Sequence, residues 1–326
     1  MNIDRKLQLA AGALVLLSLI WGYNWVVMKQ VMQYADPFDF SAIRAVLGAL
    51  VLFSVLVLRG QSLRLVAPGP TLLLGVLQTA AFTALIQWAL VGGGAGKTAV
   101  LVYVMPFWLL PLAWVFLGER VRGLQWFAVA VALIGLALIV EPWRLPADLF
   151  STGLALVAGL TWAASAVVAK RLRARIVLDL LPLTAWQMLM GAVVLCVIAW
   201  WLPSSPPQPT PYFFGALAFN AVFATGLAWV LWLFILDRLP AGIAGLSSLA
   251  VPGVGVLSGW IELGERPSGA EALGMLCIAV ALALISVQAL RARMNAPRAA
   301  VAPVVQPGTS QPALRCDAAV PGEDMR

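Results

Sequence analysis

The sequence predicts an all-α membrane protein with ten transmembrane helices that are built from two inverted five-helix repeats. Its composition gives the first reason, because 62% of the 326 residues are hydrophobic and only 11% are charged, whereas about a quarter of the residues of a soluble domain are charged. The second reason is a long internal repeat, which is found by comparing the two halves of the chain. A chain of this composition cannot cover itself for water, so we expect it in a membrane.

Ten stretches are long and apolar enough to cross a bilayer, which takes about 20 mostly apolar residues as a helix. They lie at 8–31, 39–58, 71–91, 98–117, 124–141, 152–169, 182–202, 212–236, 242–262 and 270–290. The connections between them are short, and none has room for a soluble domain. From residue 291 the sequence turns rich in Ala, Pro, Gln, Gly and Ser, which predicts a disordered cytoplasmic tail over 291–326.

The stretch that follows residue 106 is repeated after residue 252. At a constant offset of 146 positions, Pro106 falls on Pro252, Trp114 on Trp260, Thr79 on Thr225, and Leu-Gly-Glu-Arg at 117–120 on the same four residues at 263–266. At a slightly smaller offset Trp21 falls on Trp162. We therefore divide the chain into a first repeat over 1–141 and a second repeat over 142–290.

The distribution of Lys and Arg sets the orientation, because cytoplasmic loops carry an excess of them. With both termini in the cytoplasm, the cytoplasmic segments up to residue 298 hold 14 of these residues and the opposite side holds 5. Since five is an odd number of crossings, the second repeat enters the membrane from the opposite face. Inverted repeats are typical of secondary transporters, whose substrate site lies between the halves near the midplane of the bilayer.

Several classes of chemistry are excluded. The chain has no His and three scattered Cys, so a histidine base, a histidine-ligated metal site and a disulfide framework are not expected. Gly92–Thr98 resembles a phosphate-binding loop, but the position of its first glycine is Val91. We therefore expect no cofactor and no enzyme activity. The net charge of +7 follows from membrane topology, so no nucleic acid partner is expected.

The chain resembles the EamA type of the drug/metabolite transporter superfamily. The residues that carry the resemblance are Ile20–Trp25 with Lys29, the pair Arg44 and Ala45, and the two Leu-Gly-Glu-Arg copies. The second repeat departs from the pattern at its start, where only Trp162 is carried across. The resemblance implies an inner-membrane carrier of bacteria that exports small metabolites such as amino acids by alternating access. A multidrug or toxic-compound efflux carrier, a lipid flippase and a non-transporting scaffold remain alternatives.

Polar and aromatic residues in the middle of the spans are the candidates for a substrate site. The resemblance places the cavity on the first, third, fourth, sixth, eighth and ninth helices. The residues expected to line it are Trp21, Asn24, Gln78, Tyr103, Trp162, Ser165, Asn220, Trp229 and Ser248. Taken singly, each could instead join helices by packing or hydrogen bonding. The expected partners are a small-molecule substrate and the lipid bilayer, and a homodimer is left open.

Two further pairs of residues are candidate hinges or gates. Pro106 and Pro252 lie inside spans, where proline kinks a helix; a plain kink and a hinge are equally compatible with this. Glu119 and Glu265 belong to the repeated Gly-Glu-Arg turns, where glycine suits a left-handed helix cap. A structural cap is the favoured interpretation and a gate is the alternative. Arg44 is expected to anchor its helix by reaching the headgroups, and a role in the cavity is the less favoured alternative.

Overall fold

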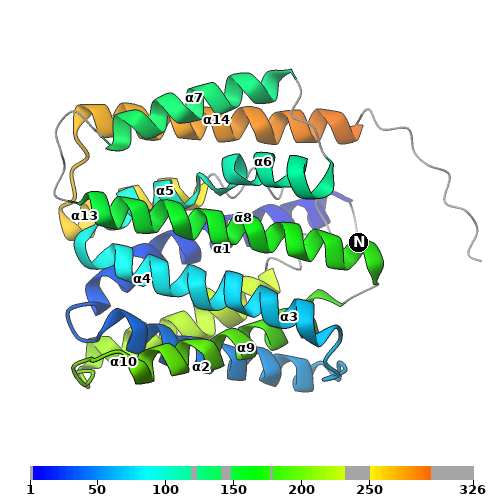
Figure 1. Ribbon diagram of the computed structural model, residues 1–326, viewed down its shortest axis with the longest axis vertical. Coiled ribbons are helices and arrows are strands. Elements are labelled where there is room, and N and C mark those ends of the chain that lie inside the picture. Colours follow the sequence, from blue (N-terminus) through cyan, green and yellow to red (C-terminus); the bar gives the residue numbers. More distant parts are fainter. Residues whose placement is uncertain (1–2, 119–122, 141–147, 177–178, 232–249, 295–326) are drawn as a thin grey trace, which may run out of the picture.

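The computed structural model describes residues 3–118, 123–140, 148–176, 179–231 and 250–294. In this part of the chain the regular structure is entirely helical, and the helices lie side by side in one bundle (Figure 1). They are α1 (Ile3–Val31), α2 (Pro37–Leu58), α3 (Pro68–Leu74), η1 (Gly75–Ala81), α4 (Phe82–Gly92), α5 (Ala95–Val102), α6 (Met105–Leu117), α7 (Leu124–Val140), α8 (Leu149–Arg175), α9 (Leu180–Trp201), α10 (Pro211–Ala218), η2 (Phe219–Leu227), α13 (Ala250–Leu263) and α14 (Gly269–Met294). The elements η1 and η2 are π-helices.

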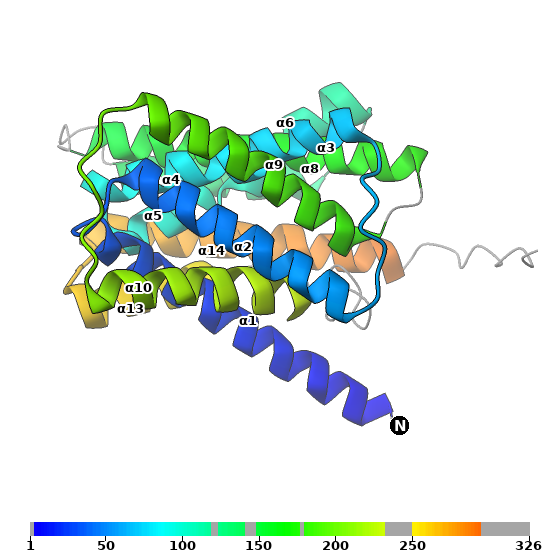
Figure 2. The ribbon, with the colours of Figure 1, turned by 90° about the horizontal axis from the view of Figure 1, so that it is seen from below.

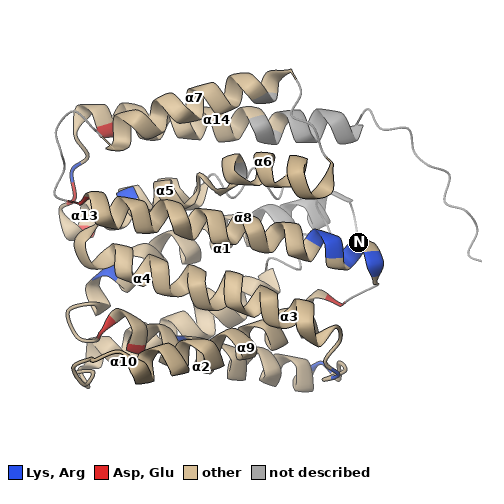
Figure 3. Ribbon diagram, in the orientation of Figure 1, with Lys and Arg blue, Asp and Glu red and all other residues tan. Residues whose placement is uncertain are grey.

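The protein is an integral multi-pass membrane protein. Seven helical segments among the described residues have the length and hydropathy to cross a bilayer, and three shorter apolar helices lie at Trp126–Val140, Ala250–Leu263 and Gly269–Leu284. Lys, Arg, Asp and Glu gather toward the two ends of the bundle and leave its middle apolar (Figure 3). Large apolar side chains cover the outside, which suits contact with lipid tails. Ten crossings remain a prediction, because three of the segments are short.

The tail begins later than predicted. The helix α14 continues to Met294, so residues 291–294 are helical instead of tail. The helix extends because Arg, Ala and Met, which fill this stretch, are all strong helix formers. The rest of the predicted tail lies outside the described residues.

The helices of the two repeats pack against each other in exchanged pairs. The π-helix η1 of the first repeat packs on α9 of the second, and η2 of the second packs on α2 of the first. In the same way α1 packs on α13, and α8 packs on α6. The helices α7 and α14 form a separate pair along one side of the bundle (Figures 1 and 2). Each repeat therefore buries its helices largely against the other.

Two glycines allow the π-helices to approach their partners closely. A Cβ added to Gly48 on α2 would lie 2.9 Å from Thr225 Cγ2, and one added to Gly191 on α9 would lie 2.4 Å from Thr79 Cβ. Thr79 and Thr225 are the residues that the repeat offset aligns. The same contact, a threonine of a π-helix on a glycine of the other repeat, thus occurs twice in the bundle.

The fourth predicted span is broken into α5 and α6. The break falls at Tyr103 and Val104, just before the first turn of α6, which contains Pro106. In an uninterrupted helix proline has no N–H to donate to the carbonyl four residues earlier, and its ring clashes with that carbonyl, which accounts for the interruption. The expected kink at Pro106 is therefore a break between two helices. Pro252 lies in the first turn of α13 and is buried.

Glycines end two helices in the left-handed conformation, as the repeated Leu-Gly-Glu-Arg turns indicate. Gly118, at the carboxyl end of α6, has φ of 70°, and Gly264, directly after α13, has φ of 67°. This conformation favours glycine because a Cβ would be strained. The left-handed conformation expected of these two glycines is confirmed.

Candidate functional site

A cavity of about 450 Å³ lies between the two repeats. Its walls come from α1, α2, η1, α4, Tyr103 and the start of α6 in the first repeat, and from α8, α9, η2 and α13 in the second, with Trp229, which follows η2. A volume of this size is typical of sites for small organic molecules. The site therefore exists only because both repeats are present.

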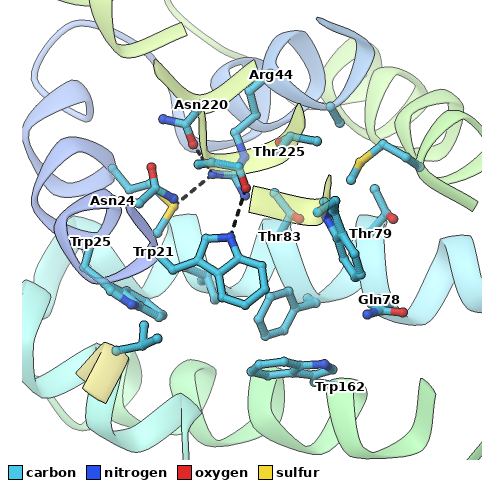
Figure 4. Close-up of a pocket in the computed structure, with 18 of the residues that line it drawn as sticks. Trp21, Asn24, Trp25, Arg44, Gln78, Thr79, Thr83, Trp162, Asn220 and Thr225 are labelled. Atoms are coloured by element: carbon cyan, nitrogen blue, oxygen red, sulfur yellow. Dashed lines mark hydrogen bonds between the residues drawn. The ribbon is translucent and has the colours of Figure 1, made fainter. Parts of the chain in front are cut away.

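Aromatic side chains form much of the wall. The indoles of Trp21 and Trp229 meet edge to face with centroids 6.2 Å apart. The indole of Trp162 packs against the rings of Phe82 and Tyr103, with ring centroids 5.1 Å and 5.6 Å apart. Figure 4 shows Trp21 and Trp162 lining one pocket from different helices. Such surfaces bind flat apolar groups through their faces and edges.

The π-helices bring backbone as well as side chains to the cavity. Residues of η1 and η2, among them Gln78, Thr79 and Thr225, line it. The Trp21 indole N–H donates a hydrogen bond of 3.0 Å to the carbonyl oxygen of Ala224, in the middle of η2. The wider turns of a π-helix are frequently found at functional sites, because they change the direction in which side chains and carbonyl groups point.

A single arginine supplies the polar end of the cavity. Arg44, on α2, donates from one guanidinium nitrogen to Asn220 Oδ1 at 2.7 Å and to Met28 Sδ at 2.9 Å. The amide nitrogen of Asn220 in turn donates to the Ala216 carbonyl, which fixes the direction of its oxygen. The dashed lines in Figure 4 mark these contacts of Arg44 and the hydrogen bond from Trp21 to Ala224. The guanidinium is thus held in place by neutral groups.

Two amide side chains complete the polar wall. Gln187 of α9 donates to Gln78 of η1 at 3.2 Å, which joins the repeats across the cavity. Asn24 is only 8% exposed, and its side-chain oxygen has no hydrogen-bond partner among the described residues. A buried acceptor without a partner destabilises the fold, so this oxygen is available to a hydrogen-bond donor of a ligand.

The structure brings most of the predicted site residues together. Those that line the cavity are Trp21, Asn24, Gln78, Tyr103, Trp162, Asn220 and Trp229. Ser165 does not line it, which corrects the expectation, because its hydroxyl donates to the carbonyl of Trp162 one turn earlier on the same helix. Ser248 lies outside the described residues. That these residues bind substrate stays a prediction.

Sequence reasoning missed several cavity residues, and it gave Arg44 a place in the cavity only as the less favoured alternative. Instead of reaching the headgroups, its side chain turns into the bundle and lines the cavity, because Asn220 and Met28 hold it there. Gln187 and Thr83 were missed as well. Thr79 and Thr225 had a detectable signal in the repeat itself, because an aligned pair of polar residues in mid-span is unusual.

Polar contacts connect the two repeats at the end of the bundle that lies away from the N-terminus. The Glu265 carboxylate accepts hydrogen bonds from the backbone N–H of Ala95 at 2.9 Å and of Gly96 at 3.2 Å. Lys97 forms ion pairs with Asp148 and Glu271 at 3.1 Å and 3.0 Å. The glycine-rich segment that resembles a phosphate loop therefore does bind an anion, since helix N-termini favour negative charge, but the anion is a side chain of the other repeat. Glu119 lies outside the described residues.

An aromatic cavity shared by two repeats in the middle of a membrane bundle is the arrangement of a transport protein. The model of the EamA-like transporter family matches residues 8–141 and again residues 149–287, and the chain belongs to this family. The protein is thus a membrane transporter, and the match points away from an enzyme.

Relatives of known sequence agree with this class. The chain is 29% identical to the uncharacterized transporter YoaV of Bacillus subtilis over 81% of this chain and 92% of that protein. It is 27% identical to the uncharacterized inner membrane transporter YedA of Escherichia coli over 94% of this chain and 99% of that one. A crystal structure with 21% sequence identity has a TM-score of 0.62 and covers 86% of this chain and 99% of its own, which shows a shared fold.

Proposed function

We propose that the protein is a secondary transporter of the bacterial inner membrane that exports small organic metabolites by alternating access. It has ten transmembrane helices in two inverted five-helix repeats, with both termini in the cytoplasm. The observation that carries the proposal is the cavity between the repeats, lined by aromatic and amide side chains and tied off toward one end of the bundle.

The direction of the helices supports inversion of the repeats. Helix α1 opens the first repeat and runs away from the end of the bundle that holds the N-terminus, whereas α8 opens the second repeat and runs toward that end (Figure 1). The exchanged packing of η1 on α9 and of η2 on α2 is what a two-fold relation between inverted repeats produces. In such transporters the conformational change is largely a rocking of one half against the other around a fixed site.

The polar contacts indicate which state the structure represents. Glu265, Lys97 and Glu262 connect the repeats at the end away from the N-terminus, where Glu262 accepts from Tyr23 at 3.2 Å and from Gln30 at 3.1 Å. With the termini in the cytoplasm, that end faces the periplasm, so these contacts support a state that is closed toward the periplasm, and in this proposal the cytoplasmic side is the one that opens. Arg171 and Trp186 also donate to backbone carbonyls of the first repeat near the cytoplasmic end. We assign Glu265 the role of a periplasmic gate, and Pro106, next to the break after α5, the role of a hinge. Pro252, buried in the first turn of α13, is the second hinge in this proposal.

A multidrug efflux carrier is the second candidate. Met28, Met105 and Met188 line the cavity beside the aromatic rings. Methionine and aromatic surfaces adapt to ligands of different shape and are found at promiscuous binding sites. The two candidates differ in how many unrelated compounds the same cavity transports.

Transport in proteoliposomes tests the proposal. Purified protein is reconstituted, and counterflow is measured for compounds that become less toxic to cells when the protein is overproduced. Transport is expected to saturate, and a Trp162→Ala variant that folds normally is expected to lose it. A reconstituted protein that moves none of these compounds would contradict the proposal, and transport of many unrelated ones would favour the second candidate.

A further inference from the structure

The charges of the cavity are unbalanced. Among the described residues that line it, Arg44 carries the single formal charge, and neither an acidic side chain nor a lysine is present. Both acceptors of Arg44, Asn220 and Met28, are neutral. The ion pairs found among the described residues belong to Lys97, so no described carboxylate lies within 4.0 Å of the guanidinium.

The guanidinium keeps most of its hydrogen-bonding capacity. It has five N–H donors, and both hydrogen bonds described for it come from one nitrogen. A planar fork of donors matches the two oxygens of a carboxylate. Charged side chains are rare within membrane spans and normally have a partner or line a pathway. Arg44 has no acidic partner among the described residues, and its side chain lines the cavity.

We propose that the transported substrate is an organic monocarboxylate whose carboxylate binds Arg44 and whose apolar or aromatic body packs between the tryptophans. The proposal rests on the transport function proposed above and narrows it to a class of substrate. One cation matches one negative charge, which favours a carboxylate over a phosphate monoester with its charge of about −1.5 to −2. A cation that stacks on the indoles, which the tryptophans alone would also allow, is disfavoured because Arg44 repels it.

The Asn24 side chain adds a second polar group to this part of the cavity. It lies on α1, one turn before Met28, which Arg44 contacts, and it is buried without a hydrogen-bond partner for its oxygen. Because this oxygen only accepts hydrogen bonds, its partner in a ligand would be a donor such as a hydroxyl or an amide N–H, while the carboxylate binds Arg44. The opposite wall, formed by Trp162, Phe82 and Tyr103, is apolar. The cavity thus offers one cationic side chain and an aromatic wall, as a carboxylate with an apolar body requires.

Ligands that differ only in charge test the proposal at equilibrium. Binding to the purified full-length protein in a neutral detergent is measured by tryptophan fluorescence for three acid and amine pairs: indole-3-acetate and tryptamine, phenylacetate and phenethylamine, and hexanoate and hexylamine. Each acid is expected to bind more tightly than its amine, and L-tryptophan is expected to bind more weakly than indole-3-acetate. The proposal is overturned if no acid binds more tightly than its amine, or if L-tryptophan binds more tightly than the acid.

Variants connect the preference to Arg44. Arg44→Gln is expected to weaken acid binding by about tenfold to a hundredfold, since a hydrogen bond to a charged group is lost, and to leave amine binding unchanged or stronger. Arg44→Lys keeps the charge without the fork and should bind acids with intermediate affinity. Arg59→Gln, an exposed arginine just after the same helix, serves as the control. Unchanged acid binding in Arg44→Gln overturns the proposal. If that variant does not fold, the proposal is decided by whether the wild-type protein binds each acid more tightly than its amine.

These measurements separate the two proposals. Binding needs no transport, so a preference for amines would overturn the substrate class while leaving the transport function in place. A protein that binds acids but moves nothing in proteoliposomes would retain the binding preference and lose the proposed function.

Discussion

The Glu265 carboxylate accepts a hydrogen bond of 2.9 Å from the backbone N–H of Ala95, so a residue of the second repeat caps a helix of the first. The nearby glycines make this possible, because a Cβ on Gly94 or on Gly259 would lie 3.0 Å from Glu265 Oε2. A charged acceptor on two N–H groups at a helix N-terminus is among the stronger hydrogen-bonding arrangements in proteins. A contact of this kind can hold one end of the bundle closed and still be released.

The first prediction concerns this cap. Glu265→Gln removes the charge and should make the amides at the start of α5 exchange with deuterium faster, by about tenfold or more, because a charge-assisted hydrogen bond contributes about 1.5–3 kcal/mol. Hydrogen–deuterium exchange of the peptide that contains Ala95 and Gly96 measures the effect. Arg266→Gln, at an exposed neighbour, is the control. Equal exchange in the two variants would show that the carboxylate does not hold the helix end.

The second prediction concerns the aromatic wall. Trp21→Phe keeps a ring next to Trp229 but loses the hydrogen bond to Ala224, whereas Trp21→Ala loses both. A tryptophan packed in a core would cost about 3–5 kcal/mol of stability on truncation. Because one side of Trp21 faces the cavity, its truncation should reduce stability by less than this. Trp21→Ala should therefore remain folded, with transport reduced by about tenfold or more. Flux and detergent thermostability are measured together, and a variant that unfolds, or one that transports normally, would make Trp21 a packing residue.

The third prediction tests the contact between η1 and α9. Gly191→Ala places a methyl group where Thr79 Cβ and the Gly75 carbonyl oxygen already lie, at 2.4 Å and 2.5 Å. Overpacking of this kind costs about 1–3 kcal/mol, so the melting temperature should fall. Gly153→Ala, inside α8 with no atom within 4 Å of the added Cβ, should be neutral or slightly stabilising because alanine favours helix. If both variants melt alike, the close approach is not required.

The fourth prediction concerns the energy source. The described lining contains no carboxyl group that could carry a proton, and Arg44 stays with the protein. Movement of a monocarboxylate alone therefore transfers one negative charge, and a membrane potential contributes about 2.3 kcal/mol per charge per 100 mV. An inside-negative potential set with valinomycin should speed acid efflux from proteoliposomes. Efflux that ignores the potential but requires an imposed pH gradient would contradict uncoupled transport.

Much of the architecture could be predicted because it depends on composition and repetition. The length of the apolar stretches predicts the spans. The aligned turns at Gly118 and Gly264 indicate both the duplication and the left-handed conformation of these two glycines. The site could be predicted in part, since Trp21 and Asn24 lie on one helix face and Trp162 is the repeat mate of Trp21.

The arrangement of Arg44 could not be predicted, because its direction depends on Asn220, which lies far away in sequence. A long cationic side chain near a span end has two destinations, the headgroups and the interior, and local sequence does not choose between them. The π-helices were missed for a similar reason. Their extra residue per turn is stabilised by packing on Gly48 and Gly191 in the other repeat, not by a local sequence signal.

Accessibility of the cavity from the two sides of the membrane tests the central claim most directly. In a variant without the three native cysteines, Thr225→Cys places a thiol in the cavity and Val193→Cys places one on the lipid-facing surface of α9. A membrane-impermeant thiol reagent should label Thr225→Cys from the cytoplasmic side, and adding Glu265→Gln should increase labelling from the periplasmic side, while Val193→Cys stays unlabelled. If Thr225→Cys resists the reagent from both sides in both backgrounds, the cavity is a closed void and the protein does not work by alternating access through it.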